Sequence, residues 1–340
     1  MSKGIAVFSG TLFLLIFTLS SGFSQKPVVP PVRIMFYNVE NLFDIYDDTL
    51  TEDNDFLPSG MMRWNYSRYK KKLSLLYKTI IAAGDWSPPG IVAMCEIENR
   101  RVLQDLIDNT NLYKFGYEII HEDSPDERGI DVALIFRKDL IKILYFRYLI
   151  PSDSGEILRT RSVLYSKCLI HSDTLHLFIN HWPSRRGGVL AGESDRIIIS
   201  DLVRNKCDSI SRNQPDAKIL ITGDLNCAPE DPVIKRLMRV TGDGSRLKNL
   251  SDSLSSTGAG SYRYSGTWEM IDQVIVSDFL LNDVSGLSAC RNDITVFKPD
   301  FLLMDDPGYP GLRPFSTYRG YRYQGGFSDH LPILVDLRFK

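Results

Sequence analysis

The chain has 340 residues, of which 43% are hydrophobic and 24% are charged, and this composition is typical of a soluble globular protein rather than a disordered or fibrous one. Its length suits one large domain or two ordinary ones. The 40 lysines and arginines against 42 acids give a net charge of −2, which is not that of a strongly basic nucleic-acid-binding protein. Any phosphate-bearing ligand would therefore need local cations or a metal ion.

The N-terminus has the pattern of a secretory signal peptide. Lys3 supplies a positive charge, the apolar run Ile5–Leu19 follows it, and small residues come next, with Ser24 as the expected cleavage point. The alternative is an uncleaved membrane anchor, but the run is short for the roughly 20 apolar residues that a spanning helix needs. We therefore expect residues 1–24 to be removed and the protein to be exported, to the periplasm or the medium, with no transmembrane segment left.

Five cysteines are spread over the rest of the chain: Cys95, Cys168, Cys207, Cys227 and Cys290. Their number is odd, and no spacing resembles that of a zinc site. Export would allow a pair to be oxidised, but the sequence does not indicate which one. Cys95 and Cys168 lie within apolar runs, so we expect these two to be buried thiols.

From Val32 onward the chain alternates between strand-like and helix-like segments. Short apolar segments, rich in β-branched and aromatic residues, are predicted strands: Val32–Tyr37, Ile91–Cys95, Val132–Phe136, Ile141–Phe146, Val163–Ile170, Leu175–Asn180, Lys218–Thr222, Ile271–Val276 and Leu331–Leu337. Amphipathic segments are predicted helices: Arg68–Ala83, Arg100–Asn109, Glu193–Ser211 and Asp231–Val240. Two further segments, Asp44–Asn65 and Pro299–Gly326, are predicted long loops, which are often functional. Many strands with few helices predict packed sheets with helices outside.

Polar residues lie at the ends of several predicted strands, where an α/β scaffold usually exposes its site. Asp224 and Asn226 follow one strand and place a carboxylate and a carboxamide two residues apart. Asp272 lies within an apolar segment, where a charge without a partner would be very costly. Each such residue has a structural explanation by itself: Asn38 suits a turn, and Glu96 suits a solvated strand end. Their combination is what indicates a site.

Six motifs occur in the order expected of the endonuclease/exonuclease/phosphatase family, the superfamily of deoxyribonuclease I. They are Tyr37-Asn38-Val39-Glu40-Asn41, Cys95-Glu96-Ile97-Glu98, Asn180-His181, Gly223-Asp224-Leu225-Asn226, Ile271-Asp272 and Ser328-Asp329-His330. The chain resembles this family from about Val32 to its C-terminus. The resemblance implies a single catalytic domain over residues 25–340 of α+β class. The implied fold is a four-layer α/β/β/α sandwich, in which two mostly antiparallel β-sheets pack face to face with helices outside.

The resemblance also implies a metal site. Glu96 matches the principal Mg²⁺-ligand carboxylate, and Asn38 and Asp329 match residues that complete the metal and phosphate environment. Glu40 is a further candidate ligand. Oxygen ligands are what Mg²⁺ prefers, and Mn²⁺ is the expected substitute.

Other matched residues carry the expected chemistry. Asp224 matches the acid that orients or deprotonates the attacking water, and Asn226 matches the carboxamide that helps to hold that water or a phosphate oxygen. Arg161 and Arg185 are candidates for binding the substrate phosphate, because the guanidinium fork suits phosphate oxygens. The alternative for both arginines is a solvated loop position.

Two histidines are implied to flank the phosphate. His330 matches the imidazole that contacts the scissile phosphate, with Asp272 as its orienting acid. His181 matches a second histidine of the deoxyribonuclease-like members, and Asp131 aligns with its acidic partner. An acid beside each imidazole would fix its tautomer and favour the protonated form. The alternative for His181 is a core histidine beside Trp182.

The resemblance therefore implies Mg²⁺-dependent hydrolysis of a phosphodiester, most directly by a nuclease outside the cytoplasm. A phosphatase or a phospholipase C-type enzyme acting on inositol or lipid phosphates would use the same core. A non-catalytic binding protein on the same fold is a third hypothesis, and the complete set of motif residues argues against it. The nearly neutral net charge mildly disfavours long nucleic acid as a substrate. No obligate protein partner is indicated.

Overall fold

The computed structural model describes residue 1 and residues 30–339, apart from residues 86, 186, 187, 189–191, 241, 243 and 282–284. The predicted signal peptide, Met1 apart, and its cleavage point lie outside the described residues. Within the described part of the chain, no helix combines the length and the apolar character needed to cross a membrane. All five cysteines are free; Cys95 and Cys168 are buried, as predicted, and Cys290 is exposed.

Two six-stranded sheets form the centre of the molecule. The first has the order β15-β20-β1-β2-β4-β3, with β1 Val32–Leu42, β2 Ile91–Ile97, β3 Tyr117–Ile120, β4 Asp131–Arg137, β15 Leu287–Val296 and β20 Ile333–Phe339. The second has the order β11-β14-β10-β9-β8-β5, with β5 Ile141–Leu149, β8 Val163–Ile170, β9 Asp173–His181, β10 Lys218–Asp224, β11 Leu247–Asn249 and β14 Asp272–Ser277. In each sheet the two central strands are parallel, β1 with β2 and β9 with β10, and the other neighbouring pairs are antiparallel.

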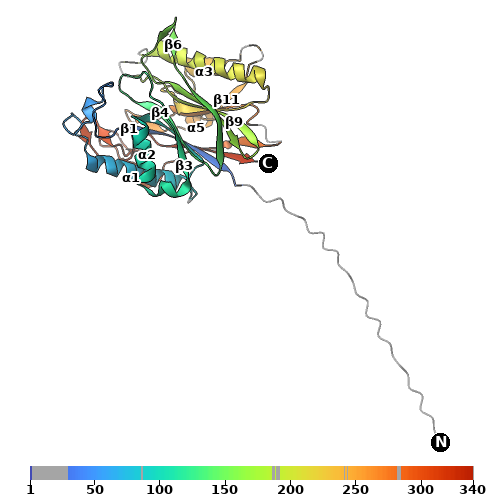
Figure 1. Cartoon of the computed structure of the whole chain (residues 1–340), viewed down its shortest axis with the longest axis horizontal. Coiled ribbons are helices and arrows are strands. Elements are labelled where there is room, and N and C mark those ends of the chain that lie inside the picture. Colours follow the sequence, from blue (N-terminus) through green and yellow to red (C-terminus); the bar gives the residue numbers. More distant parts are fainter. Residues whose placement is uncertain are drawn as a thin grey trace.

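Helices cover the outer faces of both sheets, so the predicted four-layer sandwich is confirmed. They are α1 Tyr66–Ala83 and α2 Arg100–Asp108 on the first sheet, and α3 Glu193–Asn213 and α4 Pro232–Met238 on the second (Figure 1). Alternation along the strands explains the layers, because successive side chains point to opposite faces. Ile34 and Phe36 of β1 lie in the cluster between the sheets, whereas Met35 and Tyr37 pack with α1 and α2. A strand buried on both faces reads as a continuous apolar run.

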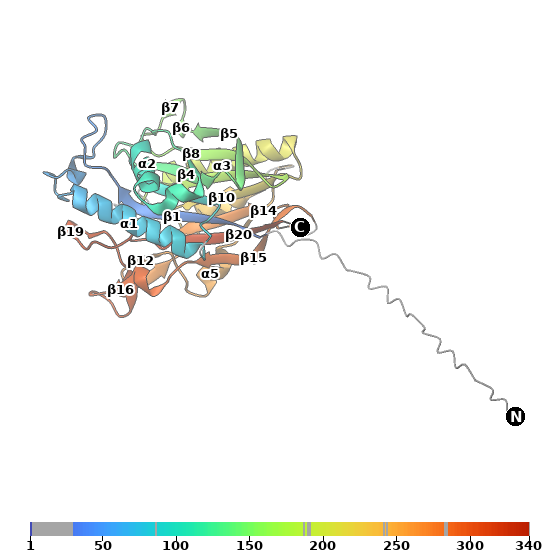
Figure 2. The ribbon, with the colours of Figure 1, turned by 60° about the horizontal axis from the view of Figure 1, so that its bottom comes forward.

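The connections contain short elements that the sequence does not predict. They are η1 Asn54–Phe56, η2 Asn111–Phe115, β6 Ser152–Asp153, β7 Glu156–Ile157, α5 Asp252–Ser256, β12 Tyr262–Tyr264, β13 Thr267–Glu269, η3 Asp300–Leu302, β16 Leu303–Asp305, β17 Leu312–Pro314, β18 Tyr318–Arg319 and β19 Arg322–Tyr323. Figure 2 shows β12, β16 and β19 together on one side of the molecule. The edge strands β3, β11 and β15 are also absent from the predicted strands. In β15, Arg291, Asn292 and Asp293 interrupt the apolar pattern, at the point where the register with β20 shifts.

Strand register brings distant motifs together. In the second sheet, Asp224 at the end of β10 pairs with His181 of β9 on one side and with Asp272 of β14 on the other. In the first sheet, Asn38 near the end of β1 lies beside the end of β2, where Glu96 stands. A 3.0 Å hydrogen bond from the side chain of Asn38 to Asp224 joins the two sheets at these strand ends. The site therefore forms where the parallel pair of each sheet ends.

Candidate active site

A cavity of about 530 Å³ opens where these strand ends meet. It is lined from both sheets and their loops by Asn41, Glu96, Arg128, Arg161, His181, Ser184, Arg185, Gly188, Asp224, Asn226, Tyr262, Tyr264, Glu269, Ile271, Asp329 and His330. Residues that are far apart in the sequence thus share one site, as the motifs predict.

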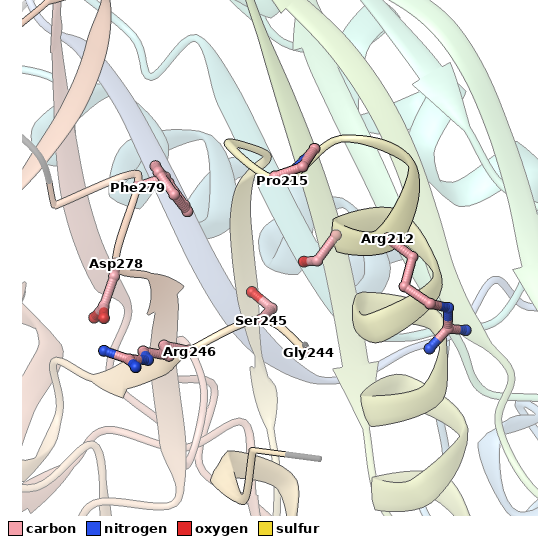
Figure 3. Close-up of a pocket in the computed structure, with 8 residues that line it drawn as sticks. Arg212, Pro215, Gly244, Ser245, Arg246, Asp278 and Phe279 are labelled. Carbon is pink, nitrogen blue, oxygen red and sulfur yellow. The ribbon is translucent and has the colours of Figure 1, made fainter. Parts of the chain in front are cut away.

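A second cavity of similar size, about 560 Å³, lies at the other end of β10. Its lining includes Arg212 at the end of α3, Arg246 and Asp278, with Arg246 and Asp278 pointing toward each other (Figure 3). Its described lining contains one acid and no histidine or cysteine. It therefore lacks the groups that hydrolysis needs, and the first cavity is the candidate active site.

Glu96 is aimed into the cavity by an irregularity in β2. Its backbone is left-handed, with φ of 63°, and the register of β2 with β4 shifts between Cys95 and Ile97. A bulge of this kind re-aims a side chain, and such backbone strain is concentrated at functional sites. The Glu96 carboxylate accepts a hydrogen bond from the backbone N–H of Asn41 at 2.8 Å and lies 3.4 Å from the side-chain nitrogen of Asn38.

Asp224 is buried at the end of β10. One carboxylate oxygen accepts from the backbone N–H of Asn226 at 3.0 Å, and the other accepts from Asn38. Burial, followed by the negative charge of Asp272, raises the pKa of Asp224 to about 7. A carboxylate with this pKa is suited to accept a proton near neutral pH. The preceding Gly223 has φ of 156°, and a side chain there would collide with the backbone of β9.

His330 and Asp272 form the hydrogen-bonded pair that the resemblance implies. The Nδ1–H of His330 donates to the Asp272 carboxylate at 2.7 Å, and the ring of Tyr262 packs against the imidazole with 4.8 Å between centres. Although burial opposes it, the charges of Asp272 and Asp224 raise the pKa of His330 well above its usual value. The imidazole is therefore a cation that can donate from Nε2 to an anion in the cavity.

His181 has a different environment, and its predicted hydrogen bond with Asp131 is absent. Its Nδ1 is buried without a partner in the described part of the chain, and its Nε2 lies 3.2 Å from a guanidinium nitrogen of Arg161. Burial, followed by the charges of Arg161 and Arg128, lowers the pKa of His181 well below its usual value. Because a guanidinium only donates, His181 is neutral and accepts at Nε2. This environment opposes the expectation that the imidazole of His181 is protonated, although Asp224 and Glu96 also lie 3.8 and 3.9 Å from its Nε2.

Asp131 is directed to the opposite face of the first sheet. It shares β4 with Ala133 and Ile135, which pack in the cluster with α1 and α2, and alternation places Asp131 on their side. Its carboxylate lies 3.2 Å from Nε2 of His121 and accepts from the backbone N–H of Ser124 at 2.9 Å. The position of an acid at the start of a strand does not reveal which face it takes, and Asp131 is not among the described residues that line the cavity.

Glu40 also lies outside the cavity lining. Its buried carboxylate accepts hydrogen bonds from the backbone N–H groups of Thr317 at 2.6 Å and Tyr318 at 2.8 Å. Its backbone is left-handed, with φ of 52°, so the side chain does not follow the strand alternation of β1. Burial, followed by the charge of Asp329, raises the pKa of Glu40 to about 8. Glu40 therefore anchors the loop that leads to the Ser328-Asp329-His330 motif and lies near Asp329, outside the described cavity lining.

Lys72 of α1 supports the same loop from inside the protein. Its side chain is fully buried, and its ammonium donates to the hydroxyl of Thr317 and, at 2.6 Å, to the carbonyl of Phe327. The next residue, Ser328, donates from its hydroxyl to the carbonyl of Asn38 at 2.7 Å. A buried ammonium is costly unless it is hydrogen-bonded, so this network fixes the motif against β1.

Lys72→Met should lower the free energy of unfolding by about 1–3 kcal/mol, because the buried Phe327 carbonyl loses its donor. Lys70→Met is the matched control: Lys70 is an exposed lysine of the same helix, and its replacement should change stability by less than about 0.5 kcal/mol. Urea unfolding followed by circular dichroism measures both values. Equal stability of the two variants would contradict the supporting role of Lys72.

Arg161 lines the cavity but is held by the protein itself. Its guanidinium donates to the carboxylate of Asp126 at 3.0 Å and to the carbonyl of Trp182 at 3.0 Å, in addition to its contact with His181. The same Trp182 carbonyl accepts from the side chain of Asn226 at 2.9 Å. Arg161 thus orders the loops around His181 and Asn226.

Arg185 is similarly engaged. Its Nε donates to the carbonyl of Asn226 at 2.8 Å, and its guanidinium forms an ion pair with Asp231. Arg128, which the motifs do not include, also lines the cavity and donates to the side chain of Asn41 at 2.7 Å. Arg128 stands three positions before Asp131 in a loop of mixed charge, so only its proximity to a motif could have singled it out.

Two tyrosines of the short strand β12 complete the cavity wall. Tyr262 packs on His330, and Tyr264 is 62% exposed. The pattern Tyr262-Arg263-Tyr264 before Asp272 is a sequence signal that lies outside the six motifs. An aromatic face at the mouth of a polar cavity can contact a flat or apolar part of a ligand.

The acids of the cavity are a suitable environment for a divalent cation. Burial, followed by neighbouring charges that include Glu96, raises the pKa of Asp329. The charge of His330 opposes this shift, and the charge of Glu96 adds to it. Glu96 and Asp329 offer the carboxylate oxygens that Mg²⁺ prefers. Asn38 instead presents its side-chain nitrogen to Glu96 and Asp224, while its side-chain oxygen accepts from the backbone N–H of Glu40 at 3.0 Å. Asp224, Asp272 and His330 form a second group, in which the possible ligand atoms all lie within 4.8 Å of one another.

The packed sheets and this acidic cavity define a fold of phosphoesterases and nucleases. A family model described as the endonuclease/exonuclease/phosphatase family matches residues 33–339. The chain belongs to this family, as the resemblance of its motifs predicts.

Solved structures share the fold at low sequence identity. The human Nocturnin catalytic domain with bound sulfate anion has a TM-score of 0.57 and 15% identity, over 92% of this chain and 95% of that one. An endonuclease/exonuclease/phosphatase from Bacteroides vulgatus has a TM-score of 0.55 and 16% identity, over 91% and 99%. D. rerio TDP2 complexed with a single-strand DNA product has a TM-score of 0.54 and 14% identity, over 91% and 99%. No curated protein matches the chain.

Proposed function

We propose that the protein is an exported, Mg²⁺-dependent phosphodiesterase that acts as a nuclease, with Mn²⁺ as a substitute ion. One observation carries the proposal: a buried carboxylate with a pKa near 7, Asp224, lies 3.8 Å from Nε2 of the cationic His330. A proton acceptor and a cationic donor in one cavity are what hydrolysis of a phosphoric ester requires. The single-strand DNA product in the TDP2 structure makes nucleic acid the first substrate class to test.

In the proposed reaction, Asp224 orients a water molecule and accepts its proton. Asn38 donates to one Asp224 oxygen and the backbone of Asn226 donates to the other, so the carboxylate is fixed in place. Groups that are fixed before the reaction lower the cost of aligning water with phosphorus. Asn226 lines the cavity and helps to position the water or a phosphate oxygen.

His330 donates from Nε2 to a phosphoryl oxygen, and Asp272 keeps the imidazole charged and oriented. His181 has a different role. As a neutral acceptor it binds the guanidinium of Arg161 through Nε2, and the positive charge of Arg161 faces the same cavity. Two histidines whose pKa values are driven apart take different roles. A metal ion held by Glu96 and Asp329 would polarise the phosphoryl group and ease departure of the leaving oxygen.

Phosphatase or phospholipase C-type action on inositol or lipid phosphates is the second candidate, because the same groups serve any phosphoric ester. Purified protein with Mg²⁺ or Mn²⁺ should be tested on DNA, RNA, simple phosphodiesters, sphingomyelin and inositol phosphates. We expect hydrolysis of DNA or RNA at the highest kcat/KM. Preference for the lipid or inositol substrates would favour the second candidate, and no hydrolysis of any of them by folded protein would favour a binding protein.

Variants of two cavity arginines separate an effect on substrate binding from an effect on protein stability. Arg128→Ala should raise KM for the best substrate about tenfold with little change in kcat, since a rim guanidinium that binds phosphate acts equally on ground and transition states. Arg185→Ala should raise KM less and lower stability, because it breaks the ion pair with Asp231. Steady-state kinetics and urea unfolding separate the two effects. An unchanged KM in Arg128→Ala would show that Arg128 does not contact substrate.

Export rests on the pattern of residues 1–24, with its charged start and its apolar run. N-terminal sequencing of protein recovered from its native cells should begin near Gln25. Mature protein that retains Met1 in the cytoplasm would contradict export, and the proposed chemistry would remain open to test.

A further inference from the structure

A histidine and two acids outside the candidate active site are grouped on one loop. His121 follows β3 directly, and Asp131 begins β4 on the face that is turned away from the cavity. The His121 and Asp131 side chains are each 2% exposed, and Nε2 of His121 lies 3.2 Å from a carboxylate oxygen of Asp131. Yet Nε2 has no hydrogen-bond partner in the described part of the chain, so the close approach lacks hydrogen-bond geometry. A buried polar atom that makes no hydrogen bond needs a structural explanation.

Two ligands of one metal ion explain this geometry. A zinc ion binds imidazole nitrogen and carboxylate oxygen at about 2.0–2.2 Å, which in a tetrahedral site places the two ligand atoms about 3.3–3.5 Å apart. The 3.2 Å separation in the structure is close to this distance. The other Asp131 oxygen accepts from the backbone N–H of Ser124 at 2.9 Å, which orients the carboxylate as outer hydrogen bonds do in metal sites.

Asp123 can supply a third ligand once its side chain turns toward Nε2. Its carboxylate is 87% exposed and lies 3.9 Å from Nδ1 of His121, the ring nitrogen that Asp131 does not contact, and ligand atoms of His121, Asp123 and Asp131 all lie within 4.8 Å of one another. An exposed side chain can turn toward the ion at small cost. Three protein ligands leave one position of a tetrahedral ion for water.

We propose that His121, Asp123 and Asp131 bind a Zn²⁺ ion at a site separate from the catalytic one. One imidazole with two carboxylates suits zinc better than Mg²⁺, which prefers oxygen ligands alone. The ion would have a structural effect on the cavity. The loop between His121 and Asp131 also carries Asp126, which holds Arg161, and Arg128, which holds Asn41. A zinc ion that fixes both ends of this loop would fix both arginines.

The test is zinc binding, which does not depend on the proposed function. Chelator-treated full-length protein is titrated with Zn²⁺ by calorimetry, and bound zinc is counted after dialysis. His121→Ala and Asp131→Asn should each bind one Zn²⁺ fewer per chain than wild type. Asp123→Ala, altered at an exposed position, should bind zinc at least about tenfold more weakly and guards against misfolding of the other two. His171→Ala, an exposed histidine outside the cluster, and Glu96→Gln, in the catalytic cavity, should keep this site.

The other explanation of the cluster is an ion pair between a protonated His121 and Asp131. In that case the variants of the cluster bind zinc with the stoichiometry and affinity of wild type, and Asp131→Asn only lowers stability. That result would overturn the zinc site. Zn²⁺ should also raise the unfolding temperature of wild type and of Glu96→Gln, but not that of His121→Ala, because a ligand stabilises the folded form that binds it. An equal rise in all three proteins counts against the site.

Discussion

Asp224→Asn should lower kcat by at least about 10²-fold with little change in KM. Asn has nearly the same shape as Asp, but its single side-chain oxygen can accept only one of the two hydrogen bonds, the one from Asn38 or the one from the backbone of Asn226. It cannot accept a proton from water, so the loss falls on the step in which water attacks. An interaction made mainly in the transition state is expected to act on kcat in this way. The measurement is steady-state kinetics on the best substrate of the screen, with folding checked by circular dichroism.

The pH profile provides a second measurement of the same residue. Asp224 must be deprotonated to accept a proton, and its pKa of about 7 places protonation near neutrality. For wild type, kcat/KM should therefore fall about tenfold per pH unit on the acid side. A bound divalent ion favours the carboxylate and moves this fall below pH 7. Asp224→Asn should lack this acid limb. Near-wild-type kcat in folded Asp224→Asn would falsify the proposed base.

A double variant tests whether Asp224 and His330 act on one centre. His330→Ala removes the donor to the phosphate and leaves Asp272 without its partner, so it should also lower kcat by about 10²-fold or more. Because both residues act on one phosphoryl group, the double variant should lose less than the product of the two single losses. Fully multiplicative losses would indicate that the residues act independently. Tyr264→Ala, at the exposed edge of the cavity, is the matched control and should keep kcat.

Removal of the metal is expected to have the largest effect of all. EDTA should abolish hydrolysis, and added Mg²⁺ or Mn²⁺ should restore it. Glu96→Gln should lower activity by at least about 10²-fold and raise the Mg²⁺ concentration needed for half-maximal rate, because an amide is a weaker ligand than a carboxylate. The neighbouring carboxyl group of Asp329 has a raised pKa, because it is buried and lies near the charge of Glu96. It therefore does not replace the Glu96 carboxylate as a metal ligand.

Two comparisons make the metal experiment specific. Glu40→Gln changes an acid of the same motif that lies outside the cavity lining, and the Mg²⁺ dependence should remain that of wild type even if stability falls. Recovery of EDTA-treated enzyme by Zn²⁺ alone would instead point to the His121 cluster or to a different catalytic ion. Undiminished activity in EDTA would rule out metal-assisted hydrolysis in this protein.

The sequence by itself determines the layers of this protein. The strands β1, β2, β9 and β10 each contain an apolar segment, Ile34–Tyr37, Ile91–Cys95, Leu177–Ile179 and Ile219–Ile221, and such a segment is stable only with both faces buried. Apolar segments of this kind, with four amphipathic helices, leave few arrangements besides two sheets under outer helices. Glu96 and Asp224 stand at the ends of β2 and β10, and His330 precedes β20. All three belong to the motifs that carry the resemblance to the family, so they are found without knowledge of any contact.

Only the tertiary structure decides how those residues face one another. Asp272 meets His330 because the antiparallel register of β14 sets Asp272 opposite Asp224, and register depends on pairing across the whole sheet. A bulge in β2 aims Glu96 into the cavity, whereas alternation in β4 turns Asp131 away from it. Side-chain direction changes with a single residue of register, and a linear pattern does not contain that information.

The charge state of each group depends on the structure in the same way. The sequence makes His181 and His330 look equivalent, each one an imidazole at a strand end. Packing places Arg161 at 3.2 Å from one and Asp272 at 2.7 Å from the other, so the pKa of His181 is lowered by burial and by Arg161, whereas the charges of Asp272 and Asp224 raise the pKa of His330. Electrostatic interactions act through space between groups that are distant in the chain, so the sequence identifies the residues of this site and the fold assigns their protons.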